Sequence, residues 1–132
     1  MRQRHFTLEE AQDQVLRLEE VFARLASLQD QLQVQHGELT TLMRQRGGNG
    51  ASSHHHEVAE GQRAVDTLTG QLRQELEEIN QRGIIVRDVA RGLVDFPSIR
   101  DGQEIFLCWI KGEARIEYWH GTNEGFGSRK RL

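Results

Sequence analysis

GLVDFPSIRDGQEIFLCWIKGEARIEYWH, residues 92–120, is the stretch that decides the fold. It consists of short runs rich in β-branched and aromatic residues, separated by the dipeptides DG at 101–102 and KG at 111–112. Both dipeptides suit two-residue type I′ turns, which need positive φ at both central positions. Together with the run GIIVRDV just upstream, the pattern predicts a small antiparallel β-meander of three to four strands over residues 83–120.

Two such turns would fix the register of the meander, because turn length decides which residues face each other. Ile99 then opposes Glu104, Asp95 opposes Cys108, and Cys108 opposes Arg115. The predicted face toward the helices is almost wholly apolar and contains Val94, Phe96, Ile105, Leu107, Trp109, Ala114, Ile116 and Tyr118. The opposite face is mixed, and Asp95, Cys108 and Arg115 form one predicted row across three of its strands.

The first half of the chain has the periodicity of long amphipathic helices. Apolar residues recur from Leu8 onward at intervals of mostly three and four, which predicts one helix that reaches Arg44. Thr7 and Glu10 have the spacing of a capping box at the start of this helix. The apolar stripe is longer than four short strands can cover, so we expect it to meet a second copy of the chain as well.

A second apolar stripe predicts another helix from about residue 57 to residue 81. The Gly/Ser/Asn-rich segment 45–56 is expected to be a mobile connection, which makes residues 6–82 a long antiparallel helical hairpin. The basic segment 121–132 is expected to be a flexible, solvated tail. The expected fold is therefore α+β, in a single domain over residues 1–132.

Composition excludes several classes of protein. With 132 residues the chain is long enough for one core, and a net charge of -3 makes nucleic acid an unlikely partner. No apolar run has the length of a membrane span, and the N-terminus lacks the apolar core of a secretory signal. One cysteine cannot form an intrachain disulfide, so we expect a reducing, cytoplasmic setting.

The predicted row of Asp95, Cys108 and Arg115 contains the first candidate for a reactive or metal-binding residue. Beside Arg115, the thiol of Cys108 would have a lowered pKa, as a nucleophile or a metal ligand requires. The alternative, which the burial habits of cysteine favour, is a small half-buried residue in a central strand. Asp95 and Glu117 would be either paired carboxylates or, with Arg115 near, a simple ion-pair network, and we favour the network.

Histidines offer a second set of candidates. His54, His55 and His56 are consecutive, and three neighbouring imidazoles in one loop cannot all reach one ion without strain. Glu117 and His120 are three apart on a strand, so their side chains point to opposite faces. The sequence therefore predicts no cofactor, and it retains the three consecutive histidines only as metal candidates that geometry disfavours.

Trp119 is predicted to point outward near the basic tail, as a surface for single-stranded nucleic acid requires. The few basic side chains of this region, among them Arg129, belong to an acidic chain, so the solvated tail is the preferred interpretation.

The strings FTLEEA, GLVDFP, LCW with KGE, YWH and GFGSR resemble an uncharacterised bacterial family, domain of unknown function 2203. The resemblance covers nearly the whole chain. It implies a small cytoplasmic bacterial protein with a helical first half and a β-rich second half, and it implies no activity. The family's motif positions would be Asp95, Phe96, Pro97, Cys108, Trp109, Gly112, Glu113, Trp119, His120, Gly125, Phe126 and Arg129.

Two hypotheses about function follow. The first is a non-enzymatic interaction or scaffold module that forms a homodimer through its hairpin, as a coiled coil does, and presents the mixed sheet face to a protein partner. The alternative is a small enzyme or metal-binding protein with a site on that face. The candidate binding residues are Asp95, Cys108, Glu113, Arg115, Glu117, Trp119, His120 and Arg129.

Overall fold

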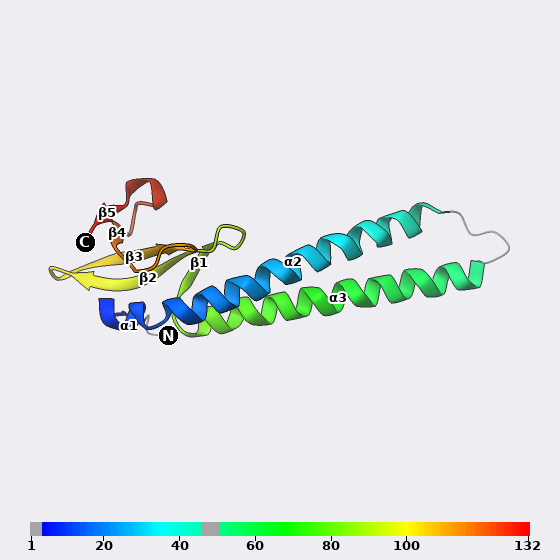
Figure 1. Ribbon diagram of the computed structural model, residues 1–132, viewed down its shortest axis with the longest axis horizontal. Coiled ribbons are helices and arrows are strands. Elements are labelled where there is room, and N and C mark those ends of the chain that lie inside the picture. Colours follow the sequence, from blue (N-terminus) through cyan, green and yellow to red (C-terminus); the bar gives the residue numbers. More distant parts are fainter. Residues whose placement is uncertain (1–3, 46–50) are drawn as a thin grey trace. The chain divides into compact units, whose positions relative to one another are not determined.

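The computed structural model describes residues 4–45 and 51–132 and has an α+β fold. Three helices precede an antiparallel sheet, as Figure 1 shows. The chain divides into two compact units, one made of residues up to Arg24 together with Glu75–Leu132, and the other of Leu25–Gln74. The predicted hairpin followed by a meander is confirmed, and each unit is described separately below.

Helix α1 is Leu8–Gln12, helix α2 is Val15–Arg44 and helix α3 is Ala51–Gln81. The predicted capping box is present, because the Thr7 hydroxyl accepts from Glu10 N–H and the Glu10 carboxylate accepts from Thr7 N–H. The single helix expected from Thr7 to Arg44 is interrupted by a turn after Gln12.

The predicted connection at 45–56 is wrong for residues 51–56, which belong to α3, so His54, His55 and His56 lie on a helix. The part of that prediction that falls on 46–50 lies outside the described residues.

The sheet has five strands in the order β1-β2-β3-β4-β5, each antiparallel to its neighbour. The strands are β1 (Ile85–Asp88), β2 (Leu93–Arg100), β3 (Gln103–Ile110), β4 (Tyr118–Gly121) and β5 (Lys130–Arg131). This is one strand more than the predicted meander, because part of the expected tail pairs with β4.

The register between β2 and β3 is as predicted, with Asp95 opposite Cys108. The turn that sets it has φ of 52° at Asp101 and 78° at Gly102, as a type I′ turn requires.

The register between β3 and β4 differs from the prediction. Cys108 opposes Tyr118 and Phe106 opposes His120, so Arg115 is not in the row. A turn at 111–112 is present, because the Glu113 N–H donates to the Ile110 carbonyl at 3.1 Å, but its predicted type I′ geometry is wrong, since φ is positive (105°) at Gly112 and not at Lys111. The chain then makes a longer connection before β4 begins. The true pairing is displaced by three positions, from 115 to 118 opposite Cys108, and an odd displacement exchanges the two faces.

One face of the sheet packs against the helices of the same unit. Val94, Phe96 and Trp109 are fully buried there. The ring of Phe6 makes an edge-to-face contact with Phe96 at 5.2 Å between centroids, and Phe22 of α2 lies 6.3 Å from Trp109. These contacts confirm the predicted apolar face for β2 and β3.

The other face is covered as well. Arg87 lies over the Phe106 ring at 5.1 Å, and Arg129 lies over the rings of Tyr118 and Phe126 at 4.0 Å and 4.5 Å. The segment expected to be a solvated tail instead contains the 3₁₀ helix η1 (Phe126–Ser128) and strand β5. The prediction of a face open to a protein partner is therefore wrong for the Asp95 and Cys108 positions, which are 2% and 0% exposed.

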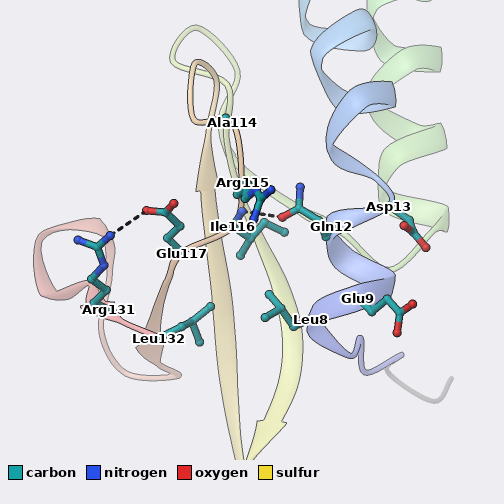
Figure 2. Close-up of a pocket in the computed structure, with 10 residues that line it drawn as sticks. All are labelled: Leu8, Glu9, Gln12, Asp13, Ala114, Arg115, Ile116, Glu117, Arg131 and Leu132. Atoms are coloured by element: carbon teal, nitrogen blue, oxygen red, sulfur yellow. Dashed lines mark hydrogen bonds and ion pairs between the residues drawn. The ribbon is translucent and has the colours of Figure 1, made fainter.

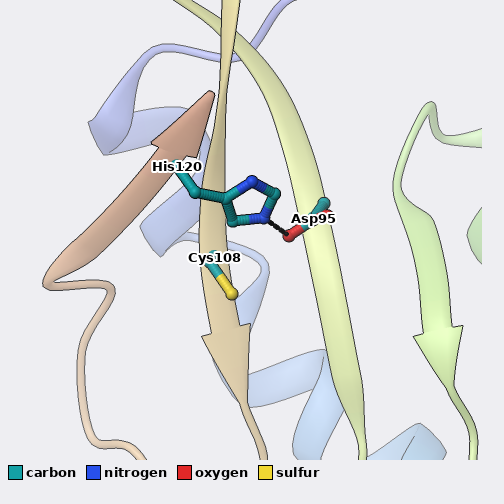
Figure 3. A group of neighbouring side chains, drawn as sticks. All are labelled: Asp95, Cys108 and His120. Carbon is teal, nitrogen blue, oxygen red and sulfur yellow. Dashed lines mark hydrogen bonds and ion pairs between the residues drawn. The ribbon is translucent and has the colours of Figure 1, made fainter. Parts of the chain in front are cut away.

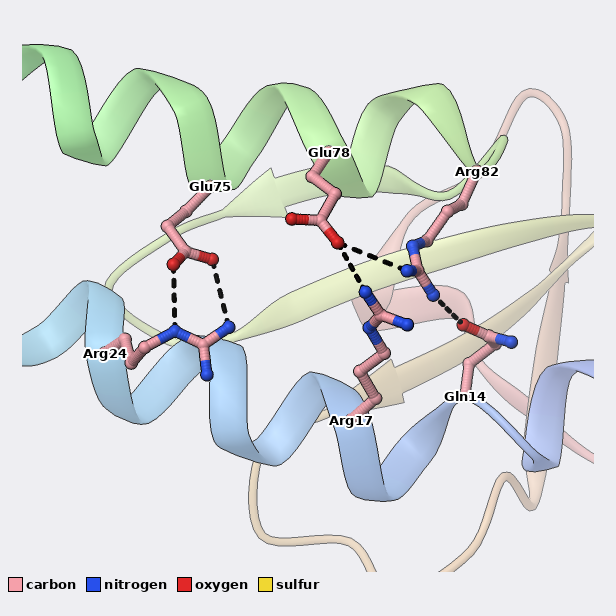
Figure 4. A network of polar contacts seen from close by, with 6 residues as sticks. All are labelled: Gln14, Arg17, Arg24, Glu75, Glu78 and Arg82. Carbon is pink, nitrogen blue, oxygen red and sulfur yellow. Dashed lines mark hydrogen bonds and ion pairs between the residues drawn. The ribbon is translucent and has the colours of Figure 1, made fainter.

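Polar contacts join α2 to α3 within the same unit (Figure 4). Arg24 donates two hydrogen bonds to Glu75, at 2.8 Å and 3.1 Å, and Arg17 pairs with Glu78. Glu78 also accepts from Arg82, which donates to Gln14 at 3.2 Å as well. Such a network constrains the orientation of α2 relative to α3 within this unit, although each exposed ion pair contributes little free energy of stabilisation.

The second unit, Leu25–Gln74, consists of the remaining parts of α2 and α3, which lie side by side in Figure 1. At Gly61 the helices approach closely, since a Cβ added there would lie 3.1 Å from Leu39 Cδ1. Leu39 and Val65 are buried, whereas Val34 and Met43 are 57% and 64% exposed. The apolar seam of this unit is therefore narrow.

Candidate functional site

Three chemically distinct side chains meet on the face of the sheet that turns away from the helices (Figure 3). Asp95 comes from β2, Cys108 from β3 and His120 from β4. Asp95 and Cys108 are direct cross-strand partners, and the three-residue register difference brings His120 to the same face. Their exposed fractions are 2%, 0% and 1%, so the group is closed to solvent.

A chain of polar contacts leads from the protein surface, at Arg87, to the buried side chains of Asp95 and His120. Arg87 Nε donates to Asp95 Oδ2 at 2.9 Å, and the other carboxylate oxygen, Oδ1, lies 2.9 Å from His120 Nε2. The second ring nitrogen of His120, Nδ1, lies 2.8 Å from the carbonyl oxygen of Gly121. Every polar atom of the Asp95 carboxylate and the imidazole therefore has a partner.

The protonation of His120 follows from these contacts. A carbonyl oxygen can only accept, so Nδ1 carries a hydrogen and donates to Gly121. Nε2 then faces an oxygen of Asp95, and without a bound cation one proton must lie between these two atoms.

Cys108 is a protonated thiol in this setting. Burial, and after it the negative charge of Asp95, raise the pKa of Cys108 from 9.0 to about 12, against the opposing effect of Arg129. The lowered pKa expected from Arg115 is wrong, because Arg115 is not beside the thiol.

Glu113 and Arg129 form a second pair next to the group. Arg129 donates to both carboxylate oxygens of Glu113, at 3.1 Å and 2.7 Å. Burial opposes the charged guanidinium, but the hydrogen bonds from Arg129 to Glu113 and Cys108 prevail and raise the Arg129 pKa. Glu113 also accepts from the Ile110 N–H at 2.9 Å, which holds the connection after β3 in place.

Arg115 and Glu117 lie elsewhere, in an open groove beside α1 (Figure 2). The groove has a volume of about 880 Å³. The Ile116 N–H between them donates to Gln12 at 2.8 Å, and Glu117 pairs with Arg131 at 3.5 Å. The groove is lined by Leu8, Glu9, Gln12, Asp13, Ala114, Arg115, Ile116, Glu117, Arg131 and Leu132. The predicted pairing of Asp95 with Glu117 and Arg115 is therefore wrong, since Asp95 pairs with Arg87 and His120.

The prediction that Trp119 shares the face of Cys108 is wrong, because Trp119 opposes Leu107. Arg100 and Lys130 lie over its ring, at 5.0 Å and 4.6 Å from the centroid. Glu124 accepts from Lys130 at 2.9 Å, so this cation is already neutralised in part.

His54, His55 and His56 lie on α3, and His56 pairs with Glu60 one turn later at 3.0 Å. They do not form a group with metal-ligand spacing, whereas within residues 4–45 and 51–132 the Asp95, Cys108 and His120 atoms do.

Sequence reasoning missed the roles of Arg87 and Gly121. Arg87 lies on the predicted first strand, and its contact with Asp95 follows from the pairing of β1 with β2. A basic residue on a strand beside one with a buried acid is a signal that could have indicated it. No local signal marks the Gly121 carbonyl as the partner of His120.

None of the described helices is long and apolar enough to cross a membrane. A family model described as "Uncharacterized conserved protein (DUF2203)" matches residues 4–132. Comparison with curated proteins and with solved structures gives no significant match.

Proposed function

The chain belongs to the DUF2203 family of uncharacterized conserved proteins, and from that premise we propose that it is a non-enzymatic interaction module that forms a homodimer through its helical hairpin. As part of the same proposal we place it in a bacterial cytoplasm, which is supported by the sequence resemblance and by a single cysteine that stays a free thiol.

The observation that carries this proposal is the narrow seam of the Leu25–Gln74 unit. Val34 and Met43 are 57% and 64% exposed on α2, while Leu39 and Val65 are buried. Further apolar residues of the unit are only half-buried, namely Leu28, Leu32, Leu42, Val58, Leu68 and Leu72. Two helices alone cannot bury a full apolar stripe, and a second pair of helices covers it.

The polar contacts of the Leu25–Gln74 unit do not hold α2 against α3 where the apolar seam is narrow. His56 pairs with Glu60 and Gln62 with Asp66, and both contacts stay within α3. Among the described residues of Leu25–Gln74, no ion pair joins α2 to α3. Identical hairpins offer identical stripes, so a second copy is the occupant that fits, in a two-fold arrangement like that of an antiparallel coiled-coil bundle.

Sedimentation equilibrium over a hundredfold concentration series tests the dimer. The protein is expected to sediment as a dimer, and Val34→Glu or Met43→Glu is expected to shift it toward monomer. Gln33→Glu is the matched control, because it adds the same charge at a neighbouring exposed polar position and leaves the stripe intact. A strict monomer at every concentration, with native helix content by circular dichroism, would contradict the proposal.

A second candidate function is a small enzyme or metal-binding protein with its site at Asp95, Cys108 and His120. One observation favours it, the convergence of three potential ligand side chains from three strands. Arg115, which the sequence placed in this site, has no part in it. Metal analysis of protein purified without chelators tests this candidate, and protein free of stoichiometric metal would count against it.

A further inference from the structure

The Asp95, Cys108 and His120 group has the composition and spacing of a metal site. The carboxylate oxygen, the thiol sulfur and the imidazole nitrogen lie within 4.8 Å of one another, and all three residues are buried. Nitrogen and sulfur ligands exclude Mg²⁺ and Ca²⁺, which prefer oxygen, and fit Zn²⁺ and its neighbours.

The contacts around the group match those of side chains that hold a metal. His120 Nδ1 donates to the Gly121 carbonyl, which fixes the tautomer and directs the Nε2 lone pair toward Asp95. Arg87 holds the outer carboxylate oxygen of Asp95 and leaves Oδ1 directed inward. Surface histidines or carboxylates that bind metal adventitiously lack such support.

The charges of the three side chains also fit a bound divalent ion. The Nε2 lone pair and the Oδ1 lone pair face each other at 2.9 Å, so either a proton between them or a metal ion bonded to both must offset their repulsion. A divalent ion with one carboxylate, one thiolate and one neutral imidazole forms a neutral group, which suits a site closed to solvent.

We propose that Asp95 Oδ1, Cys108 Sγ and His120 Nε2 form a three-ligand site for a divalent transition metal of the zinc class. This inference rests on the second candidate function and is independent of dimerisation. On binding, two protons pass to solvent, one from the Cys108 S–H bond, which breaks, and one from between Asp95 Oδ1 and His120 Nε2. The electron pairs that these protons leave on sulfur, oxygen and nitrogen form the bonds to the metal. Three protein ligands leave one coordination position for water or for an oxygen of a bound molecule.

Co²⁺ is the probe that tests the site, because its spectrum reports thiolate ligands and tetrahedral geometry. The protein used in the test carries His54→Gln, His55→Gln and His56→Gln, so that these imidazoles, which are half-buried or exposed on α3, do not bind the probe. We expect one Co²⁺ per chain, a near-ultraviolet sulfur-to-cobalt charge-transfer band, and loss of that band when Zn²⁺ is added.

Variants assign the ligands. Cys108→Ser is expected to abolish the charge-transfer band, and His120→Asn to weaken Co²⁺ binding by at least about tenfold. Glu117→Gln is the matched control, since Glu117 is a carboxylate that lies outside the group, in the groove beside α1, and the variant is expected to bind Co²⁺ normally.

Two results would overturn the inference: folded protein that binds no Co²⁺, or bound Co²⁺ whose spectrum lacks the sulfur band. Either result leaves a proton-bridged Asp95 and His120 pair as the content of the site. Because the spectrum of the protein with Asp95, Cys108 and His120 intact is diagnostic by itself, a ligand variant that fails to fold does not remove the test. Sedimentation of the same samples reports the dimer separately, so the failure of one proposal is distinguishable from the failure of the other.

Discussion

His120 Nε2 and Asp95 Oδ1 lie 2.9 Å apart, although 25 residues separate them in the chain and both side chains are almost wholly buried. A buried pair of this kind costs much to break, because removal of one partner leaves the other without its hydrogen bond or its charge partner.

In metal-free protein, Asp95→Ala is expected to lower the free energy of unfolding by about 3 kcal/mol, since His120 and Arg87 both lose a partner. Denaturant unfolding followed by circular dichroism measures this loss. The control is Glu117→Ala, which breaks an exposed ion pair with Arg131 at 3.5 Å and is expected to change the stability by less than about 1 kcal/mol. Equal losses in both variants would contradict this difference.

The Cys108 thiol is expected to react with a thiol reagent only when the metal-free protein unfolds, because it is 0% exposed and protonated. Its pKa rises from 9.0 to about 12 on folding, so the unfolded chain ionises first as pH increases. The stabilisation is therefore complete below pH 9 and is lost as pH rises toward about 12. Denaturation midpoints below and above pH 9 measure the loss.

The matched variant for this prediction is Cys108→Ser, whose hydroxyl does not ionise in that range. It should remove the part of the alkaline loss that belongs to the thiol. Rapid and complete reaction of native wild-type protein with the reagent would show that the thiol is accessible.

The capping box of α1 is expected to contribute to stability in a way that depends on pH. The Thr7 backbone N–H, and then the Thr7 hydroxyl, lower the pKa of Glu10 from 4.5. A carboxylate with a lowered pKa stabilises the fold above its ordinary pKa and loses that effect as pH falls through the lowered value. Thr7→Ala is expected to cost about 1 kcal/mol at neutral pH, measured by thermal or denaturant unfolding. Glu10→Gln tests the charge separately, and it should flatten the acid side of the profile.

The two tryptophans are expected to differ in fluorescence. Trp109 is 0% exposed and packs against Phe22, whereas Trp119 is partly exposed beside Lys130. Trp119→Phe should leave blue-shifted emission that a polar quencher does not reach. Trp109→Phe should leave emission that the quencher reduces. The opposite pattern would place Trp119 in the core.

The sequence predicted the strand pairing that local turn residues determine, and it did not predict the pairing that depends on tertiary contacts. The pairing of Asp95 with Cys108 was predicted because Asp101 and Gly102 both adopt the positive φ that their residue types favour. The pairing of β3 with β4 was not, because the turn at Lys111-Gly112 has positive φ only at Gly112, so it is not the type I′ turn that would pair residues 113–117 with β3.

One contact remote in sequence and one local contact hold the longer connection after β3 in its place. The Ile116 N–H donates to Gln12, 104 positions away, and Trp109 Nε1 donates to the Glu113 carbonyl at 2.9 Å. Local patterns carry no signal for the first of these contacts. The observed register places His120 in the candidate site and Arg115 outside it, and only the tertiary structure determines this register.

The attachment of the N-terminal segment to the sheet has a consequence for synthesis on the ribosome. The Phe6 N–H donates to the Pro97 carbonyl, and Ser98 donates to the Phe6 carbonyl across 92 residues. The helices are translated well before the strands that cover them, so their apolar stripe must wait uncovered while the rest of the polypeptide emerges. During that interval a nascent chain is open to chaperones or to a neighbouring nascent copy, and this exposure ends only when β2 and β3 have left the exit tunnel.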